Sequence, residues 1–185
     1  MASVSKSVFG YPIRIKYKGQ YDFDGLMALI RGYYRKNKFL KLDEPKFKYK
    51  VGGGGAEVEF KFQGERKITH YIRAHMYIEG HMWKVKREEV VEGGKKVLRS
   101  NGRGEFRISG KFELDYRDRF KELNPGDSGY DKFYHGLDKW MQSKLDADAV
   151  GLQYGDNKVS GKKYVQKLII RFGDEIKKFL KMECI

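Results

Sequence analysis

The sequence is poor in cysteine and proline and has no long apolar segment. Its 185 residues include one cysteine, Cys184, so an intramolecular disulfide is excluded and a reducing compartment is favoured. No apolar run approaches the roughly 18–20 residues that span a bilayer, and residues 1–6 lack the apolar core of a signal peptide. These absences predict a cytoplasmic protein without a membrane partner.

Signatures of catalysis and of metal binding are missing too. The four histidines and the distant cysteine show no spacing typical of a zinc site. General acid–base catalysis needs a carboxylate whose pKa is shifted by burial or by a neighbouring like charge. The acids of the expected strands lie instead on wet faces: Glu57, Glu59, Glu113 and Asp115. We therefore expect no enzyme activity, no cofactor and no metal site.

Periodic apolar residues predict a strand and then a helix near the N-terminus. Residues 11–17 alternate between apolar and polar side chains, as a half-buried strand does. Apolar residues then recur at helical spacing over 23–37, after Asp22 or Asp24 as the N-cap. We expect the apolar stripe of this helix to face a sheet: Phe23, Leu26, Met27, Ile30 and Tyr34.

Strand patterns continue over most of residues 45–116. Residues 45–51 and 56–62 alternate on either side of Gly52–Gly55, which predicts a hairpin with lysines opposite glutamates. No Gly-Lys-Ser/Thr follows these glycines, so a hairpin turn is favoured over a phosphate-binding loop. The apolar phase changes after Gly80, which indicates either one long strand bulged there or a tight turn. A turn is expected at residues 92–95, and residues 106–116 form the cleanest alternation.

The C-terminal third predicts two helices, over 129–146 and 160–182, joined through a loop at 151–158. The element order predicts an α+β fold, because an antiparallel sheet with one dry face needs helices to cover it. We expect a curved antiparallel sheet of five to seven strands, with an N-terminal helix and two C-terminal helices packed on one face. A single domain over 1–185 would then hold the sheet and first helix at 10–117 and a helical segment at 128–182.

Two resemblances accompany this pattern. The element order resembles the helix-grip domains of the START and polyketide-cyclase type, which implies a space between sheet and helix for an apolar ligand. The stretch Val51–Glu59, followed by His70–Ile72 and Met82–Trp83, is similar to a group of uncharacterised small archaeal proteins with a glycine turn before a glutamate-alternating strand. That second resemblance implies no activity.

The whole chain has a net charge of +14, and its basic residues concentrate in the first quarter. Residues 31–50 hold eight Lys or Arg and two acids, and such clustering attracts polyanions. The sequence therefore predicts a non-enzymatic protein that binds RNA, DNA, a ribonucleoprotein or another polyanion through phosphate contacts, with Tyr33 stacking on a base. The predicted nucleic-acid-binding residues are Arg31, Tyr33, Arg35, Lys36, Lys38, Lys41, Lys46, Lys48 and Lys50.

Other interpretations of the same residues stay open. Cations at the end of the first helix are partly explained by the helix dipole, and a lysine-rich surface can simply be solvated. The thirteen tyrosines and a possible open sheet edge at residues 46–51 suggest a self-assembling oligomer, filament or shell, although edge lysines discourage strand pairing. A helix-grip carrier of an apolar ligand is the third possibility.

Overall fold

The computed structural model describes residues 4–68, 72–114, 151–154 and 157–182. The predicted helix over 129–146, and with it part of the predicted helical segment, lies outside these residues. The chain forms two compact units. The first comprises Met1–Gly10, Lys67–His75 and Gly110–Leu168, and the second comprises Tyr11–Arg66, Met76–Ser109 and Ile169–Ile185. The single-domain organisation stays a prediction.

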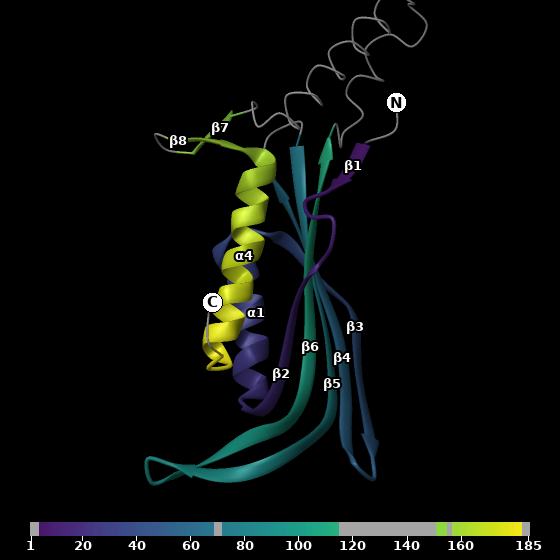
Figure 1. Ribbon diagram of the computed structural model, residues 1–185, viewed down its shortest axis with the longest axis vertical. Helices are drawn as coiled ribbons and strands as arrows, with labels where there is room; N and C mark the ends of the chain where they lie inside the picture. The colour runs from purple at the N-terminus through teal and green to yellow at the C-terminus, as the bar shows by residue number, and fades with distance from the viewer. Residues whose placement is uncertain (1–3, 69–71, 115–150, 155–156, 183–185) are drawn as a thin grey trace, which may run out of the picture. The chain divides into compact units, whose positions relative to one another are not determined.

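Among the described residues the main sheet has six strands, in the order β1-β6-β5-β4-β3 with β2 also paired to β6 (Figure 1). It is five strands wide, because β1 and β2 pair antiparallel with different parts of β6. The α+β class and the antiparallel sheet are therefore confirmed. Its strands are β1 (Val4–Ser7), β2 (Ile13–Tyr21), β3 (Leu40–Gly52), β4 (Gly55–Lys67), β5 (Ile72–Glu92) and β6 (Lys95–Leu114).

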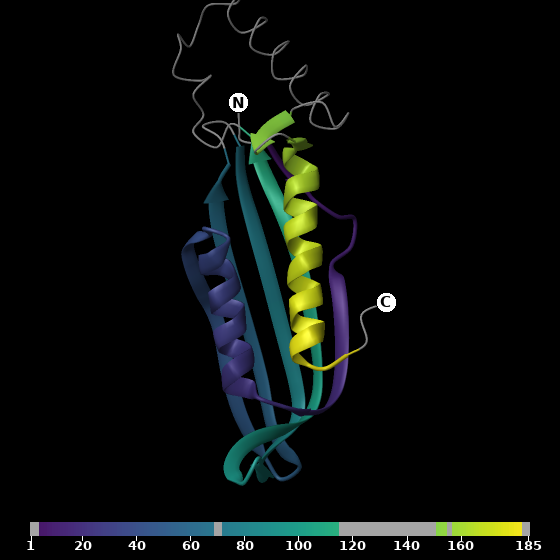
Figure 2. The same cartoon turned by 90° about the vertical axis from the view of Figure 1, so that its left-hand side faces the viewer.

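Helix α1 (Phe23–Lys36) confirms the predicted N-terminal helix. The Asp22 side chain accepts a hydrogen bond of 3.0 Å from the backbone N–H of Gly25, which satisfies one of the unpaired amides of the first turn. Helix α4 (Gly161–Phe179) lies within the predicted C-terminal helix. In the second unit both helices cover one face of the sheet, as Figure 2 shows. We call this the inner face and the opposite side the outer face.

The core of the second unit lies between the inner face and the two helices. Strand β4 alternates as predicted, with buried Ala56, Val58, Phe60 and Phe62 pointing inward. The aromatic ring of Phe172 on α4 lies 5.9 Å from that of Tyr34 on α1, and both residues are fully buried. Burial of large aromatic side chains supplies much of the stability of such a core, because the hydrophobic effect scales with the apolar area removed from water.

Strand β5 confirms one long strand and corrects the position of its irregularity. The inward-facing residues of β5 have even numbers up to Met82, and the next inward-facing residue, Val85, has an odd number. The backbone of Lys84 has a φ of +53°, so the phase changes there and not at Gly80. As a result, Trp83 keeps the outward parity of His81. The prediction of a bulge at Gly80 is wrong because that glycine serves packing: a Cβ there would lie 2.2 Å from the Phe60 ring.

In the first unit, β1 pairs with β6 from Val4↔Leu114 to Ser7↔Lys111. A small hairpin of β7 (Gly151–Tyr154) and β8 (Asn157–Ser160) replaces the predicted loop at 151–158. That prediction is wrong because a four-residue strand is too short to establish a period of two. Within the described residues, neither helix has both the length and the apolarity needed to cross a membrane.

Candidate functional site

Four of the eight predicted cations form ion pairs with acids from other elements. The guanidinium of Arg31 donates two hydrogen bonds to Glu44, of 2.8 and 3.1 Å, and this pairing lowers the pKa of the Glu44 carboxyl. Three predicted lysines form further ion pairs: Lys36 with Glu175 at 3.8 Å, Lys41 with Glu65 at 2.8 Å, and Lys46 with Glu59. These acids come from β3, α4 and β4, so each is brought in by the fold.

The remaining predicted cations do not form one patch. Arg35, Lys38, Lys48 and Lys50 make no ion pair among the residues that the structure describes. Lys38 follows α1, however, whereas Lys48 lies ten residues further along the extended chain of β3. Between Leu40 and Lys48 the register advances from Glu65 to Glu59 on β4, so at about 3.3 Å per residue the backbone of Lys48 lies roughly 20 Å from the start of β3. The cluster is thus divided as well as partly neutralised.

The prediction that Tyr33 stacks on a base is wrong. Its side chain is 3% exposed, and its ring stacks on that of Phe172 with centroids 4.3 Å apart and planes at 17°. Tyr33 lies beside the apolar stripe that faces the sheet, and α4 packs against that side of α1. A second helix at this position is not visible in the local sequence pattern.

The outer face holds a second group of cations, on β2 and β6, outside the predicted cluster at residues 31–50. The register places Arg14 opposite Arg107 and Lys18 opposite Arg103. All four side chains are exposed. Like charges directly opposite each other destabilise a sheet, so two such pairs on neighbouring strands carry an energetic cost. We call Arg14, Lys16, Lys18, Arg103 and Arg107 the cationic strip.

One acid, Glu105, lies within the cationic strip, opposite Lys16. Its carboxylate accepts a hydrogen bond of 2.8 Å from Arg107. This bond, together with the charges of Lys16 and Arg14, lowers the pKa of the Glu105 carboxyl. The strip therefore keeps a clear excess of positive charge even with Glu105 fully ionised.

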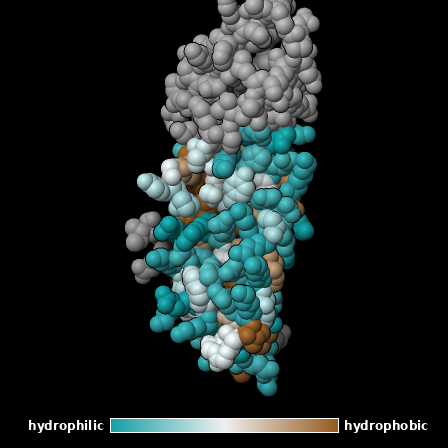
Figure 3. All heavy atoms as spheres, turned by 90° about the vertical axis from the view of Figure 1, so that its right-hand side faces the viewer, coloured by the Kyte–Doolittle hydropathy of each residue, from teal (hydrophilic) through white to brown (hydrophobic). Residues whose placement is uncertain are grey.

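Trp83 lies beside the cationic strip on the adjacent strand β5. Its ring centroid is 4.0 Å from that of His81, with the planes at 35°. An open depression of about 440 Å³ is lined by Trp83, Tyr17, Gly104 and Glu105 together with three members of the strip, Lys16, Lys18 and Arg103. The outer face in Figure 3 is mostly hydrophilic. An amphipathic ring at the edge of a cationic depression is therefore the main recognition feature of this face.

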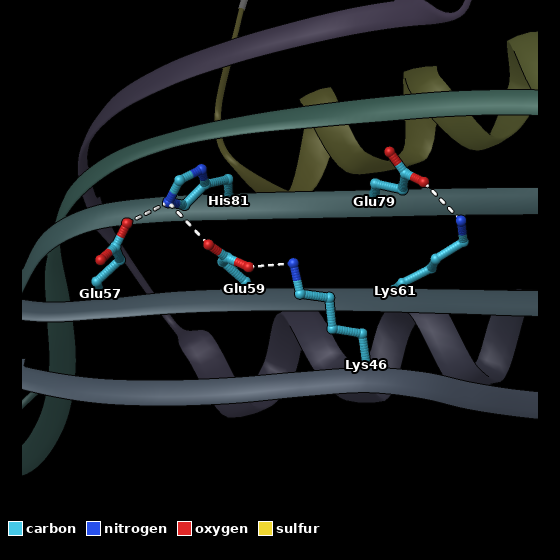
Figure 4. A network of polar contacts seen from close by, with 6 residues as sticks. All are labelled: Lys46, Glu57, Glu59, Lys61, Glu79 and His81. Atoms are coloured by element: carbon cyan, nitrogen blue, oxygen red, sulfur yellow. Dashed lines mark hydrogen bonds and ion pairs between the residues drawn. The ribbon is translucent and has the colours of Figure 1, made fainter.

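Figure 4 shows a network of charged residues from β3, β4 and β5. The Nε2 atom of His81 lies 2.6 Å from Glu57 Oε1 and 3.8 Å from Glu59 Oε1. The hydrogen bond from Lys46, followed by the charges of His81 and Lys48, lowers the pKa of the Glu59 carboxyl. Lys61 and Glu79 form a separate ion pair of 2.8 Å. These side chains come from β3, β4 and β5 and share the outer face.

Three members of this network could hold a metal ion. One ligand atom each from Glu57, Glu59 and His81 lies within 4.8 Å of the others. The chain separates His81 from these glutamates by more than twenty residues, which is why motif spacing did not bring them together. Lys46 already compensates Glu59, and His81 is hydrogen-bonded to Glu57, so the group is satisfied as an ion-pair network. A second depression of about 440 Å³ lies over this network and is also lined by Trp83.

Comparison of the sequence with protein-family models and with curated proteins finds no match to either. The function is therefore inferred from the geometry of the outer face.

Proposed function

We propose that this protein binds single-stranded nucleic acid without catalysis, on the outer face of its sheet. The observation that carries the proposal is the juxtaposition of like-charged pairs on β2 and β6 beside the ring of Trp83. An anion held between Arg14 and Arg107, or between Lys18 and Arg103, would relieve the repulsion within each pair. This gives the unfavourable register a physical reason.

The chemistry of the strip fits a phosphate backbone. Lysine and arginine bind phosphate without reading the base, and their affinity falls steeply with salt because counterions are released. Successive bases of a single strand stack on aromatic rings, at about 1–3 kcal/mol per base. Trp83 borders both depressions, so a base lying on it would have phosphates within the reach of the cationic strip. Duplexes present no free base faces for such stacking, which is why a single strand is favoured.

The test is fluorescence anisotropy with a labelled oligouridylate and a labelled oligothymidylate of about 12 nucleotides, a length within the site sizes of single-strand-binding folds. Each titration is repeated across a salt series. We expect binding at low salt, and we expect the double substitution K18E/R103E to weaken it. The slope of log K against log salt should also become shallower in that variant, by about 0.7 for each phosphate that the protein no longer neutralises.

A matched control reverses two cations of the originally predicted cluster, in the variant R35E/K38E. Both control residues are exposed and lie away from the outer face. The control should change affinity much less than K18E/R103E does. No binding at about 50 mM salt, a concentration at which non-specific phosphate binding is strong, would overturn the proposal. An equal loss of affinity in both variants would contradict a site on the outer face and would favour the originally predicted cluster at the end of α1.

The helix-grip carrier is a weaker candidate. Its ligand would lie between the sheet and a helix, yet in the second unit Phe60, Tyr34 and Phe172 are fully buried there. Large side chains in contact fill a core instead of lining a cavity.

A further inference from the structure

Within the part of the chain that the structure describes, strand β3 leaves one edge of the main sheet open. It is the last strand in the sheet order and pairs only with β4. Its inward-facing residues are unusually exposed for apolar side chains: Phe47 is 50% exposed, Tyr49 is 49% exposed and Val51 is 79% exposed. The segment from Lys46 to Gly52 keeps a regular register with β4, whereas shifts occur between Leu40 and Lys46. The usable edge is therefore Lys46–Gly52.

The register determines which backbone groups of this edge point away from β4. Gly52 and Gly55 pair across a turn of two residues, Gly53 and Gly54, so they form a hydrogen-bonded pair. Antiparallel pairs alternate, so Lys46, Lys48 and Lys50 also bond to β4. The N–H and C=O groups of the intervening residues, Phe47, Tyr49 and Val51, then point outward from the sheet.

The side chains of the edge specify the chemistry of its partner. Lys46, Lys48 and Lys50 form a row on the outer face, and the last two make no ion pair among the described residues. Phe47, Tyr49 and Val51 form an apolar row on the inner face. A complementary strand needs acids on one face and apolar residues on the other. Strand β4 already shows that pattern against β3, with Glu59 opposite Lys48 and Glu57 opposite Lys50.

We propose that the Lys46–Gly52 edge binds an extended segment of a partner protein in which acidic and apolar residues alternate, as an added antiparallel strand. Backbone hydrogen bonds to Phe47, Tyr49 and Val51 supply affinity, and the lysine row selects acidic residues. A second copy of this chain fits badly, because antiparallel pairing of two β3 strands brings their lysine rows together on one face. Lysines on an edge strand discourage self-pairing in this way.

The probe is a labelled synthetic peptide, acetyl-Gly-Ala-Glu-Val-Glu-Phe-Glu-amide, which copies the pattern of β4, titrated against the full chain by fluorescence anisotropy. Tyr49→Pro removes one outward N–H and breaks no bond to β4, because proline is tolerated where the N–H of an edge strand faces solvent. Tyr49→Ala is the matched control, since it removes the ring and keeps the N–H. We expect the proline variant to bind at least tenfold more weakly than the alanine variant.

A charge swap tests the selectivity of the lysine row. The variant K48E/K50E should lose the acidic peptide and bind a version with lysine in place of each glutamate. Circular dichroism and the nucleic-acid titration serve as fold controls, because Tyr49→Pro leaves the cationic strip intact. The proposal is overturned if the acidic peptide shows no binding at a protein concentration of about 1 mM. A Kd of that size corresponds to a binding free energy of about −4 kcal/mol. The proposal is also overturned if the proline and alanine variants bind equally.

Discussion

Gly80 is expected to be the most sensitive glycine of the inner face. A Cβ at this position would lie 2.2, 2.4 and 2.8 Å from three atoms of the Phe60 ring. Real Cβ atoms essentially never approach another heavy atom below 3.0 Å, so either the ring or strand β5 must move. Phe60 is 2% exposed and packs edge-on against Phe62 at 5.6 Å, which leaves the ring little freedom. We expect Gly80→Ala to destabilise the protein by about 1–3 kcal/mol, the range found for overpacked cores.

Gly104 provides a matched control on the neighbouring strand. It also lies on the buried face, yet a Cβ there would meet its nearest atom, in Phe106, at 3.4 Å, which is ordinary contact. Gly104→Ala should therefore change the free energy of unfolding by less than about 0.5 kcal/mol, as substitutions away from a strained contact usually do. The comparison separates a steric effect at Gly80 from the general effect of alanine in a strand.

The assay is urea unfolding followed by circular dichroism, with Phe60→Leu and the double variant G80A/F60L completing a cycle. Leucine removes the ring edge that the new methyl group would strike, so the double variant should be more stable than the sum of the single changes predicts, by about 1 kcal/mol or more. Additive effects, or a Gly80→Ala variant as stable as wild type, would refute the packing assigned to this position.

Three further predictions concern titration and helix capping. Burial raises the pKa of Tyr21 to about 12 and also raises the pKa of Tyr34, so both phenols favour the folded state while neutral. Phenols of the unfolded chain ionise at about pH 10, so the free energy of unfolding should fall as the pH rises from about 10 toward 12. In an alkaline titration, the tyrosinate absorbance of these two residues should appear only at the pH where the protein unfolds. Replacing Asp22 with alanine should cost about 1 kcal/mol in urea unfolding, and an unchanged midpoint would contradict its role as the N-cap. The Arg31 guanidinium lowers the pKa of Glu44, so the stability that this ion pair supplies is present above the usual glutamate pKa and is lost as the pH falls. Both side chains are exposed, so Glu44→Gln should lower the free energy of unfolding at neutral pH by less than about 1 kcal/mol. A larger loss in urea unfolding would contradict this assignment.

Local periodicity predicted the elements whose pattern is long. Helix α1, the β3–β4 hairpin with its opposed charges, and the glycine turn after Glu92 follow the sequence closely. Strands β1, β7 and β8 were missed because each has four residues, too few for a period to be distinguished from chance. The phase change of β5 was noticed but placed at Gly80, since glycine is the usual residue of a bulge and Lys84 with positive φ is not.

The site was harder to predict than the fold, because charge neutralisation depends on which residues meet in space. Lys36 and Glu175 are separated by most of the chain, and Arg31 meets Glu44 only after the turn into β3. Counting charges along a window therefore overestimated the cluster at residues 31–50. Arg14 and Arg107 fall within the predicted strands at 11–17 and 106–116, whereas Lys18 and Arg103 lie just outside them. The repulsion within both pairs exists only once β2 is aligned with β6. The charges that meet on a sheet face depend on the strand register. Such a site could therefore be found by testing each plausible alignment of two strands for outward-facing charges that lie opposite each other, whereas a count of charges along the sequence cannot find it.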